Sequence, residues 1–357
     1  MKILFLIPYP LGESPSQRFR FEQYFNVLNH SGHLFTHQSF LDPKDWKLLF
    51  QKGKPLTKFF FLLRGFFKRF LILLKLSDYS MIFIHREVAP VGPPVFEWII
   101  SKIFKKKIIY DFDDAIWLTD RKDESWILET LKWRSKIQSI CRWSYKVSCG
   151  NEYLCDYARQ FNERVFYNPT TIDTGNLHNP SLYKIDSKDK IIIGWTGSHS
   201  TLKYLNDLEP ALQVLEQKYP HLPINVISDI APKLHLRSLH FNPWSLETEI
   251  SDLAQFDIGI MPLPEDEWSK GKCGFKALQY MSLQIPTVAS PVGVNSQIIK
   301  HAKNGFLCST KSEWENYLSI LIENKTLRDS IGKIGRENVI ARYSISSNSS
   351  NFLSLFS

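Results

Sequence analysis

The chain has 357 residues, a net charge of +8 and 43% hydrophobic residues. This length suits two domains rather than one core, and the composition is globular, which excludes fibrous and disordered proteins. The whole charge excess lies in residues 1–175, which contain 26 lysines and arginines and 18 acidic residues. Such a local excess favours an anionic membrane surface over nucleic acid as a partner.

Continuous apolar runs bounded by turn residues predict buried strands of parallel sheets in two successive α/β halves. The polar segment 174–189 is predicted to be the linker between them. The first run, Ile3 to Ile7, is too short for a secretion signal and is predicted to be a strand. The predicted strands are 2–7, 79–85, 106–114, 145–151 and 164–169 in the first half, and 190–197, 224–229, 256–263, 286–291 and 305–308 in the second.

The segment 47–75 contains eight basic residues, no acidic residue and many phenylalanines and leucines. Its uncharged apolar runs are far shorter than the roughly 20 residues needed to span a bilayer. We interpret it as a helix lying in a membrane interface with a cationic rim; a core helix with a solvated basic edge is the alternative. The five cysteines include no C-x2-C pair, which favours reduced thiols and a cytoplasmic protein, peripheral on the inner face of the cytoplasmic membrane.

The turn after the first predicted strand is PYPLGESPSQRFR, residues 8–20. It lacks the G-x-G-x-x-G pattern, which disfavours a plain NAD-binding domain. Gly12 lets the backbone approach a ligand, and Arg18 and Arg20 offer charge to an anion at the start of the next helix. A capped helix with surface arginines is the alternative interpretation.

Three carboxylates, Asp111, Asp113 and Asp114, follow the predicted strand 106–114. Three acids at one strand end are costly unless a cationic or polar group meets them, so we predict a functional site there. Asp113 or Asp114 could instead cap a helix. The D-x-D spacing also fits a metal-binding motif of metal-dependent glycosyltransferases.

Two glycine-containing turns in the second half are suited to phosphate. GWTGSHSTLKYL, residues 194–205, places Gly197 and Ser198 before a helix, with Lys203 within reach. A glycine-containing turn without a ligand, which is common between a strand and a helix, is the alternative.

The second turn, KGKCGFKALQYMSL, residues 270–283, surrounds Gly274 with Lys272 and Lys276 before the helix that begins near Phe275. Backbone approach, unpaired helix-start amides and ammonium groups together favour a diphosphate site. A solvated lysine cluster is the alternative.

The runs FDIGIMPLP (256–264) and YMSLQIPTVASPVGVN (280–295) resemble retaining glycosyltransferases of the GT-B fold, specifically glycosyltransferase family 4. CGNEYLCDYA, YNPTTID and GRENVIARYS extend the resemblance over nearly the whole chain. It implies two Rossmann-like domains facing across a cleft. It assigns 1–175 to acceptor binding and 186–338 to nucleotide-sugar binding, and lets the helix in 339–357 cross back to the N-terminal domain.

The chain departs from the family pattern at the E-x7-E motif. Gly271 and Gln279 occupy the two glutamate positions, and Gln279 can still donate hydrogen bonds to ribose hydroxyls. The family's phosphate-binding arginine falls on Ser198, which leaves the diphosphate to Lys203, Lys272 and Lys276. The family's His-Asp pair falls on Asp113 and Asp114.

The resemblance thus implies sugar transfer from a nucleotide-diphosphate sugar to an acceptor hydroxyl, with retention and without a metal or other cofactor. The basic and aromatic residues of the first half favour a lipid-linked or saccharide acceptor, in polysaccharide or glycolipid assembly. Asp113, Asp111 and Lys276 are the expected catalytic residues. The expected donor-binding residues are Gly12, Arg18, Gly197, Ser198, Lys203, Lys272, Gly274, Phe275 and Gln279. An epimerase-like nucleotide-sugar enzyme and a non-catalytic nucleotide-sugar-binding protein remain the alternatives.

Overall fold

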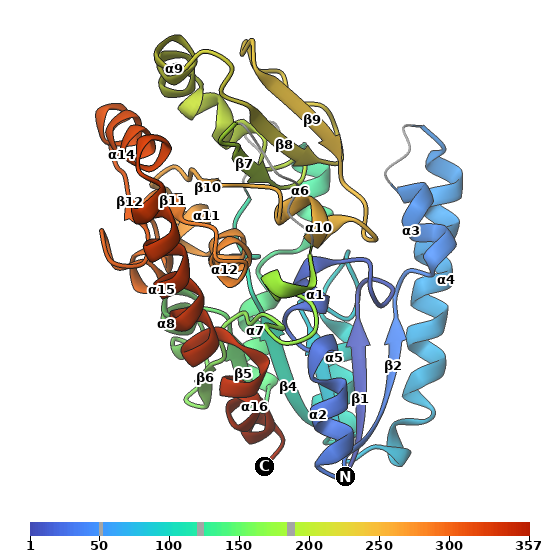
Figure 1. Ribbon diagram of the computed structural model, residues 1–357. Helices are drawn as coiled ribbons and strands as arrows, with labels where there is room; N and C mark the ends of the chain where they lie inside the picture. Colours follow the sequence, from blue (N-terminus) through green and yellow to red (C-terminus); the bar gives the residue numbers. More distant parts are fainter. Residues whose placement is uncertain (50–52, 120–124, 184–189) are drawn as a thin grey trace. The chain divides into compact units, whose positions relative to one another are not determined.

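The computed structural model describes residues 1–49, 53–119, 125–183 and 190–357. It is an α/β protein that divides into two compact units (Figure 1). The first unit comprises Met1–Thr170 and Ser349–Ser357, and the second comprises Thr171–Asn348. Within the predicted linker 174–189, residues 184–189 lie outside the described part of the chain, as do 50–52 of the basic segment.

The first unit is built on a parallel sheet with strand order β2-β1-β3-β4-β5-β6 in the described residues. The interior strands carry the continuous apolar runs, because helices cover both faces of a parallel sheet. The strands are β1 (Lys2–Ile7), β2 (Leu34–Ser39), β3 (Met81–His85), β4 (Lys107–Phe112), β5 (Lys146–Cys149) and β6 (Val165–Tyr167).

One face of this sheet is covered partly by the C-terminal segment. Phe5 of β1 and Phe83 of β3 pack against Phe356, with ring centroids 6.3 and 6.2 Å apart. Lys146 donates hydrogen bonds to the carbonyls of Ser354 and Ser357 at 2.7 and 2.9 Å. These contacts tie the last residues of the chain to the first unit.

Helices connect the strands of the first unit, and polar side chains cap some of their ends. Asn151, for example, caps the helix after β5, because its side chain accepts a hydrogen bond from the Leu154 amide at 2.8 Å. The elements are α1 (Pro15–Arg18), η1 (Glu22–Tyr24), α2 (Phe25–His30), α3 (Pro43–Leu49), α4 (Pro55–Leu73), η2 (Leu76–Asp78), α5 (Val95–Trp98), η3 (Ile99–Ile103), α6 (Trp126–Lys132), α7 (Lys136–Trp143), α8 (Glu152–Arg159) and η5 (Ser354–Phe356).

The second unit is built on another parallel sheet, with order β12-β11-β10-β7-β8-β9. Read from β9, this is the order of the doubly wound nucleotide-binding fold. The strands are β7 (Ile193–Thr196), β8 (Ile224–Ser228), β9 (Leu239–Pro243), β10 (Ile258–Met261), β11 (Thr287–Ala289) and β12 (Phe306–Leu307).

Alternate residues of these strands belong to two separate cores. Ile258 and Ile260 of β10 join a cluster with the helix after β7, whereas Gly259 between them faces the ring of Tyr280. A Cβ at Gly259 would lie 2.4 Å from that ring, so the helix packs against the strand only because the residue is glycine.

The domain boundary predicted at residue 338 lies within α15 of the second unit. The next helix, α16, begins in the second unit and ends in the first. A capping box between Thr310 and Glu313 starts α14. The elements are η4 (Pro180–Leu182), α9 (Lys203–Lys218), α10 (Glu249–Leu253), α11 (Glu267–Lys270), α12 (Phe275–Ser282), α13 (Asn295–Ile298), α14 (Lys311–Glu323), α15 (Lys325–Tyr343) and α16 (Ile345–Leu353).

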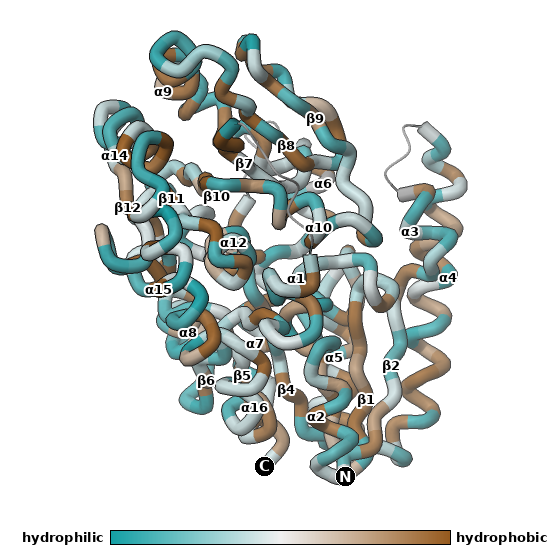
Figure 2. Tube along the Cα trace, viewed as in Figure 1, coloured by the Kyte–Doolittle hydropathy of each residue, from teal (hydrophilic) through white to brown (hydrophobic). Residues whose placement is uncertain are grey.

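Helix α4 carries hydrophobic residues along its length (Figure 2). Phe61, Leu62 and Phe66 pack against the core of the first unit, whereas the opposite apolar face is exposed. Arg69, by contrast, is 0% exposed and donates hydrogen bonds to the carbonyls of Ile7, Gln38 and Val88 at 2.6 to 2.8 Å. Lys68 pairs with Asp42 at 2.6 Å. Eight side chains on the outer face are 43% to 73% exposed: Leu56, Phe59, Phe60, Leu63, Phe67, Phe70, Leu71 and Leu74.

Candidate functional site

The strand orders identify where each unit can bind a ligand. In the first sheet β1 lies between β2 and β3, and in the second sheet β7 lies between β8 and β10. Connections on the two sides of such a switch point leave in opposite directions, so the carboxyl ends of β1 and β3, and of β7 and β10, are the expected ligand sites.

A buried carboxylate lies at the carboxyl edge of the first sheet. Asp111 of β4 is 0% exposed, and its Oδ1 accepts hydrogen bonds from Arg20 and, at 2.6 Å, from Ser148. Its Oδ2 lies 2.9 Å from Nδ1 of His85, the last residue of β3. Burial alone would raise the pKa of Asp111, but the Arg20 guanidinium and the bond to His85 outweigh it and hold the pKa well below its ordinary value. Asp111 is therefore an enclosed, ionised carboxylate.

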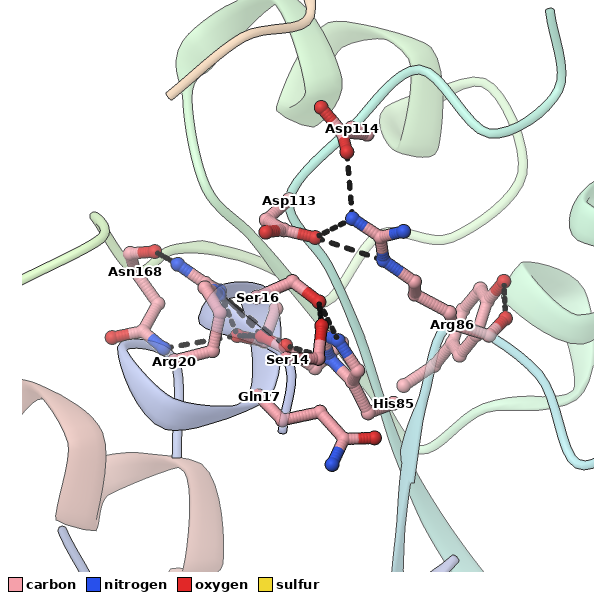
Figure 3. Close-up of polar contacts among 12 residues, drawn as sticks. Ser14, Ser16, Gln17, Arg20, His85, Arg86, Asp113, Asp114 and Asn168 are labelled. Atoms are coloured by element: carbon pink, nitrogen blue, oxygen red, sulfur yellow. Dashed lines mark hydrogen bonds and ion pairs between the residues drawn. The ribbon is translucent and has the colours of Figure 1, made fainter. Parts of the chain in front are cut away.

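The network continues from His85 toward solvent. Nε2 of His85 lies 3.4 Å from Oγ of Ser16 in α1, and Ser14 Oγ lies 3.0 Å from Ser16 Oγ (Figure 3). His85 is 0% exposed, whereas Ser16 is partly exposed. The carboxyl ends of β1, β3 and β4 therefore share one hydrogen-bonded chain.

The two remaining aspartates are held by an arginine. Arg86 donates hydrogen bonds to Asp113 Oδ1 at 2.8 and 3.1 Å and to Asp114 Oδ2 at 2.6 Å (Figure 3). Burial lowers the pKa of Arg86, but the two carboxylates raise it above its ordinary value. Arg86 has a φ of +60°, a left-handed conformation rare for a residue with a side chain, and its carbonyl accepts a 2.6 Å hydrogen bond from Tyr110. The predicted D-x-D pair thus divides between two arginines, because Asp111 pairs with Arg20 and Asp113 with Arg86.

The first turn places its predicted residues near the same edge. Gly12 has a φ of +81°, and its amide donates a 2.9 Å hydrogen bond to Glu22. Burial raises the pKa of Glu22, although the Gly12 bond opposes it. The Arg18 guanidinium lies 4.9 Å from the centroid of the Phe19 ring. Arg20, predicted to meet an anion, meets the Asp111 carboxylate of the protein itself.

In the second unit, Trp195 of β7 joins two of the predicted phosphate turns. The Nζ of Lys276 lies 5.3 Å from its ring centroid, and a Cβ at Gly197 would lie 2.4 Å from the same ring. The sequence separated these turns by about 80 residues, yet they meet on one 1% exposed tryptophan. Gly274 has a φ of +69° and directly precedes α12, which starts with the partly exposed Phe275.

The other predicted donor-binding residues lie around these turns. Lys272 lies over Trp268, with Nζ 4.8 Å from the ring centroid, and Lys203 lies over Tyr204 at 5.4 Å. Ser198 contacts Ser200 with 2.9 Å between their hydroxyl oxygens.

Gln279 has a different environment from the lysines. It is 1% exposed and its Nε2 lies 3.3 Å from Oε1 of the buried Glu249 and 3.4 Å from Nε2 of His178. Gln279 thus lies in the interior of the second unit, next to a carboxylate from α10.

Four residues of these sites were not predicted from the sequence: Ser16, His85, Arg86 and Glu249. The contact of Trp195 with both phosphate turns was not predicted either. The sequence did contain a signal for two of them, because His85 is the last residue of the buried run YSMIFIH and Arg86 directly follows it. Polar residues at the carboxyl end of a buried parallel strand are the expected ligand groups. Within the described residues, no group of three or more His, Cys, Asp and Glu side chains is placed to hold a metal ion, and no helix is long and apolar enough to cross a membrane.

Comparisons with known proteins agree with this architecture. Residues 253–338 match the family model described as Glycosyl transferases group 1. Sucrose-phosphate synthase from Thermosynechococcus elongatus has a similar structure, with a TM-score of 0.72 and 14% identity over 100% of this chain and 98% of that one.

Anabaena HepE, solved in complex with UDP-glucose, has a TM-score of 0.71 and 17% identity over 100% of this chain and 99% of that one. A glycosyltransferase from Rickettsia africae has a TM-score of 0.70 and 13% identity over 99% and 97%. Comparison with curated proteins gives no significant sequence match. The predicted GT-B fold is confirmed.

Proposed function

We propose that the protein is a glycosyltransferase that moves a sugar from a nucleotide-diphosphate sugar to an acceptor hydroxyl. One observation carries the proposal: Trp195 brings the Gly197 turn and Lys276 together at the switch point of a doubly wound sheet. An exposed glycine turn and an ammonium group at such a point suit a diphosphate. The family match supports it, because residues 253–338 contain Lys272, Gly274 and Lys276.

The second unit would bind the donor. Lys276, Lys272 and Lys203 would neutralise the negative charge that develops on the leaving diphosphate, with Gly197, Ser198, Gly274 and Phe275 forming the surface on which it lies. HepE was solved with UDP-glucose, which supports this donor class. No metal or other cofactor forms part of the proposal, since lysines supply the positive charge.

The first unit would bind the acceptor and orient the sugar. Arg86 fixes Oδ1 of Asp113, so that the carboxylate is presented in one orientation at the carboxyl edge of the sheet. Retention of anomeric configuration belongs to the proposal, as does a role in cell-surface polysaccharide or glycolipid assembly on the cytoplasmic side of the membrane.

A thermal-shift panel of UDP-, GDP- and ADP-sugars tests donor binding, because a ligand bound to the native state raises the melting temperature. The best donor, labelled in its sugar, is then incubated with saccharide acceptors. A labelled glycoside with the donor's anomeric configuration is the expected product. A converted nucleotide sugar would indicate an epimerase-like enzyme instead, and tight nucleotide binding without turnover a binding protein.

The exposed face of α4 favours an anionic membrane as the surface on which the enzyme works. Eight exposed apolar side chains cover the outer face of α4 and its C-cap residue Leu74. Arg64, 60% exposed in its side chain and paired with Asp42, lies beside them. A helix with an apolar outer face and a basic flank lies stably in the interface of an anionic bilayer. A membrane-bound, lipid-linked acceptor would then reach the first unit by lateral diffusion.

Flotation with vesicles of phosphatidylglycerol and phosphatidylcholine tests this surface. The wild-type protein should float with anionic vesicles, and Phe67→Ser with Phe70→Ser should abolish flotation without lowering the melting temperature. Ile334→Ser with Ile340→Ser is the matched control, since both side chains are exposed on α15. Dimers that dissociate in the α4 variant, without flotation of the wild type, would assign the face to a second copy instead.

A further inference from the structure

The hydrogen bonds of the polar groups behind Ser16 run in one direction when Asp111 is ionised and His85 is neutral. Asp111 is ionised and can only accept, so Nδ1 of His85, 2.9 Å from its Oδ2, carries a proton and donates. When His85 is neutral, its Nε2 carries no proton and accepts, so Ser16 Oγ, 3.4 Å from Nε2, donates its single proton to it.

The same logic fixes the contact between the two serines. Because the Ser16 proton is directed at His85, Ser14 is the donor in the 3.0 Å contact between the two hydroxyl oxygens. The donors run in one direction, from Ser14 through Ser16 and His85 to Asp111, and successive bonds of this kind strengthen one another. Among the described residues, Ser16 Oγ contacts only Ser14 and His85, which leaves it one lone pair.

The remaining lone pair lies at the place where the sheet is expected to bind a ligand. Ser16 follows β1 and His85 ends β3, the two strands at the switch point of the first sheet. His85 and Asp111 are 0% exposed, whereas Ser16 is partly exposed. A purely structural network would have no need to end on a solvent-accessible oxygen at this edge.

We propose that Ser16 binds the acceptor and accepts a hydrogen bond from one of its saccharide hydroxyls. The inference rests on the proposed glycosyltransferase function and deepens it. Since its own proton is committed to His85, Ser16 selects for a hydroxyl, which can donate, over an ether or carbonyl oxygen, which cannot. His85 and Asp111 act as positioning residues that set this polarity.

The test uses the full-length enzyme, the donor with the largest thermal shift, and octyl glycosides of glucose, galactose and N-acetylglucosamine as acceptors. Ser16→Ala should raise the acceptor KM about three- to tenfold, the effect of one neutral hydrogen bond, without changing the donor KM or the melting temperature. Ser16→Thr, which keeps the hydroxyl, should restore the wild-type value. Ser101→Ala is the control, because Ser101 also uses its hydroxyl in the first unit, in a 3.0 Å bond to the Trp143 carbonyl.

Single-deoxy acceptors separate recognition from structure. In the wild type, removing one particular hydroxyl should raise the KM by the same factor as Ser16→Ala, and in Ser16→Ala that removal should have no further effect. An unchanged acceptor KM in Ser16→Ala, equal changes for both substrates, or a deoxy effect that persists in the variant would overturn the inference. A wild type that binds no nucleotide sugar, or transfers to none of the octyl glycosides, would instead count against the proposed function.

Discussion

Arg20 and Asp111 lie 91 residues apart in the chain and meet inside the first unit, both without solvent exposure. A buried ion pair is costly to desolvate, and removing one partner leaves an uncompensated buried charge. This pair survives because Ser148, His85 and the Asn168 carbonyl complete its hydrogen bonds. The network thus connects β3, β4, β5 and the segment after β6 at one edge of the sheet.

Asp111→Asn should destabilise the first unit by about 3–5 kcal/mol, because the Arg20 guanidinium loses its counter-charge. The pKa of Asp111 is depressed below its ordinary 3.8. Its contribution to stability is therefore full above that value and is lost as the pH falls further toward the folded-state pKa. Urea unfolding at pH 7 and pH 3 measures both effects, and the gap between wild type and variant should narrow at pH 3. An equal gap at both pH values would contradict an ionised Asp111.

Lys276→Ala and Lys272→Ala should each weaken binding of the nucleotide sugar about tenfold or more, because each ammonium would contact a charged diphosphate. Calorimetric titration with the best donor measures this, and Lys272→Ala should leave the acceptor KM nearly unchanged. Lys218→Ala is the control, since Lys218 pairs with Glu323 at the far end of α9. Wild-type donor affinity in both variants would refute the assigned phosphate contacts.

At the scale of elements, the interior strands and the edge strands β6 and β12 were predicted from the sequence, whereas the edge strands β2 and β9 were not. β4 and β8 are recognisable in the sequence as apolar runs, because both faces of a parallel sheet are covered by helices. β2 and β9 lie at the edges and are largely exposed, so LFTHQS and LHFNP show no such run. For the candidate site, the single turns were visible in the sequence, but contacts such as Arg20 with Asp111 and Lys276 with Trp195 were not, because they depend on the packing of distant elements.

Helix α12 depends on the left-handed Gly274 that starts it. A Cβ there would lie 2.3 Å from Cδ1 of Ile298, and the φ of +69° is strained for other residues. Gly274→Ala should therefore lower the free energy of unfolding by about 1–3 kcal/mol and displace the helix start, weakening donor binding. Gly32 has a similar φ of +73°, but a Cβ there would meet nothing within 4 Å. Gly32→Ala therefore measures the cost of the backbone conformation alone. Equal losses in the two variants, with unchanged donor affinity in Gly274→Ala, would contradict the role of the close packing.

At the scale of the whole molecule, the two sheets use their switch points with different chemistry. The first presents carboxylates, a histidine and serines, each held by a partner in the same unit, whereas the second presents glycine turns and lysines on tryptophans. Hydroxyl-rich ligands suit the first set and diphosphates the second. This division is the one that the proposed function requires, with the acceptor bound by the first unit and the nucleotide sugar by the second.

The same division makes a prediction about metals. Asp111 and Asp113 pair with Arg20 and Arg86, so binding a divalent cation would require breaking an ion pair, whereas the lysines of the second unit already carry the charge a diphosphate needs. Transfer by the enzyme should therefore proceed at the same rate in EDTA and show no stimulation by Mg²⁺ or Mn²⁺, measured as release of nucleoside diphosphate. Asp113→Ala should lower that rate in either buffer, because the oriented carboxylate is lost while Arg86 keeps Asp114 as a partner. Activity that disappears in EDTA and returns with Mn²⁺ would instead assign the aspartates to a metal and require Arg86 to release Asp113 during the reaction.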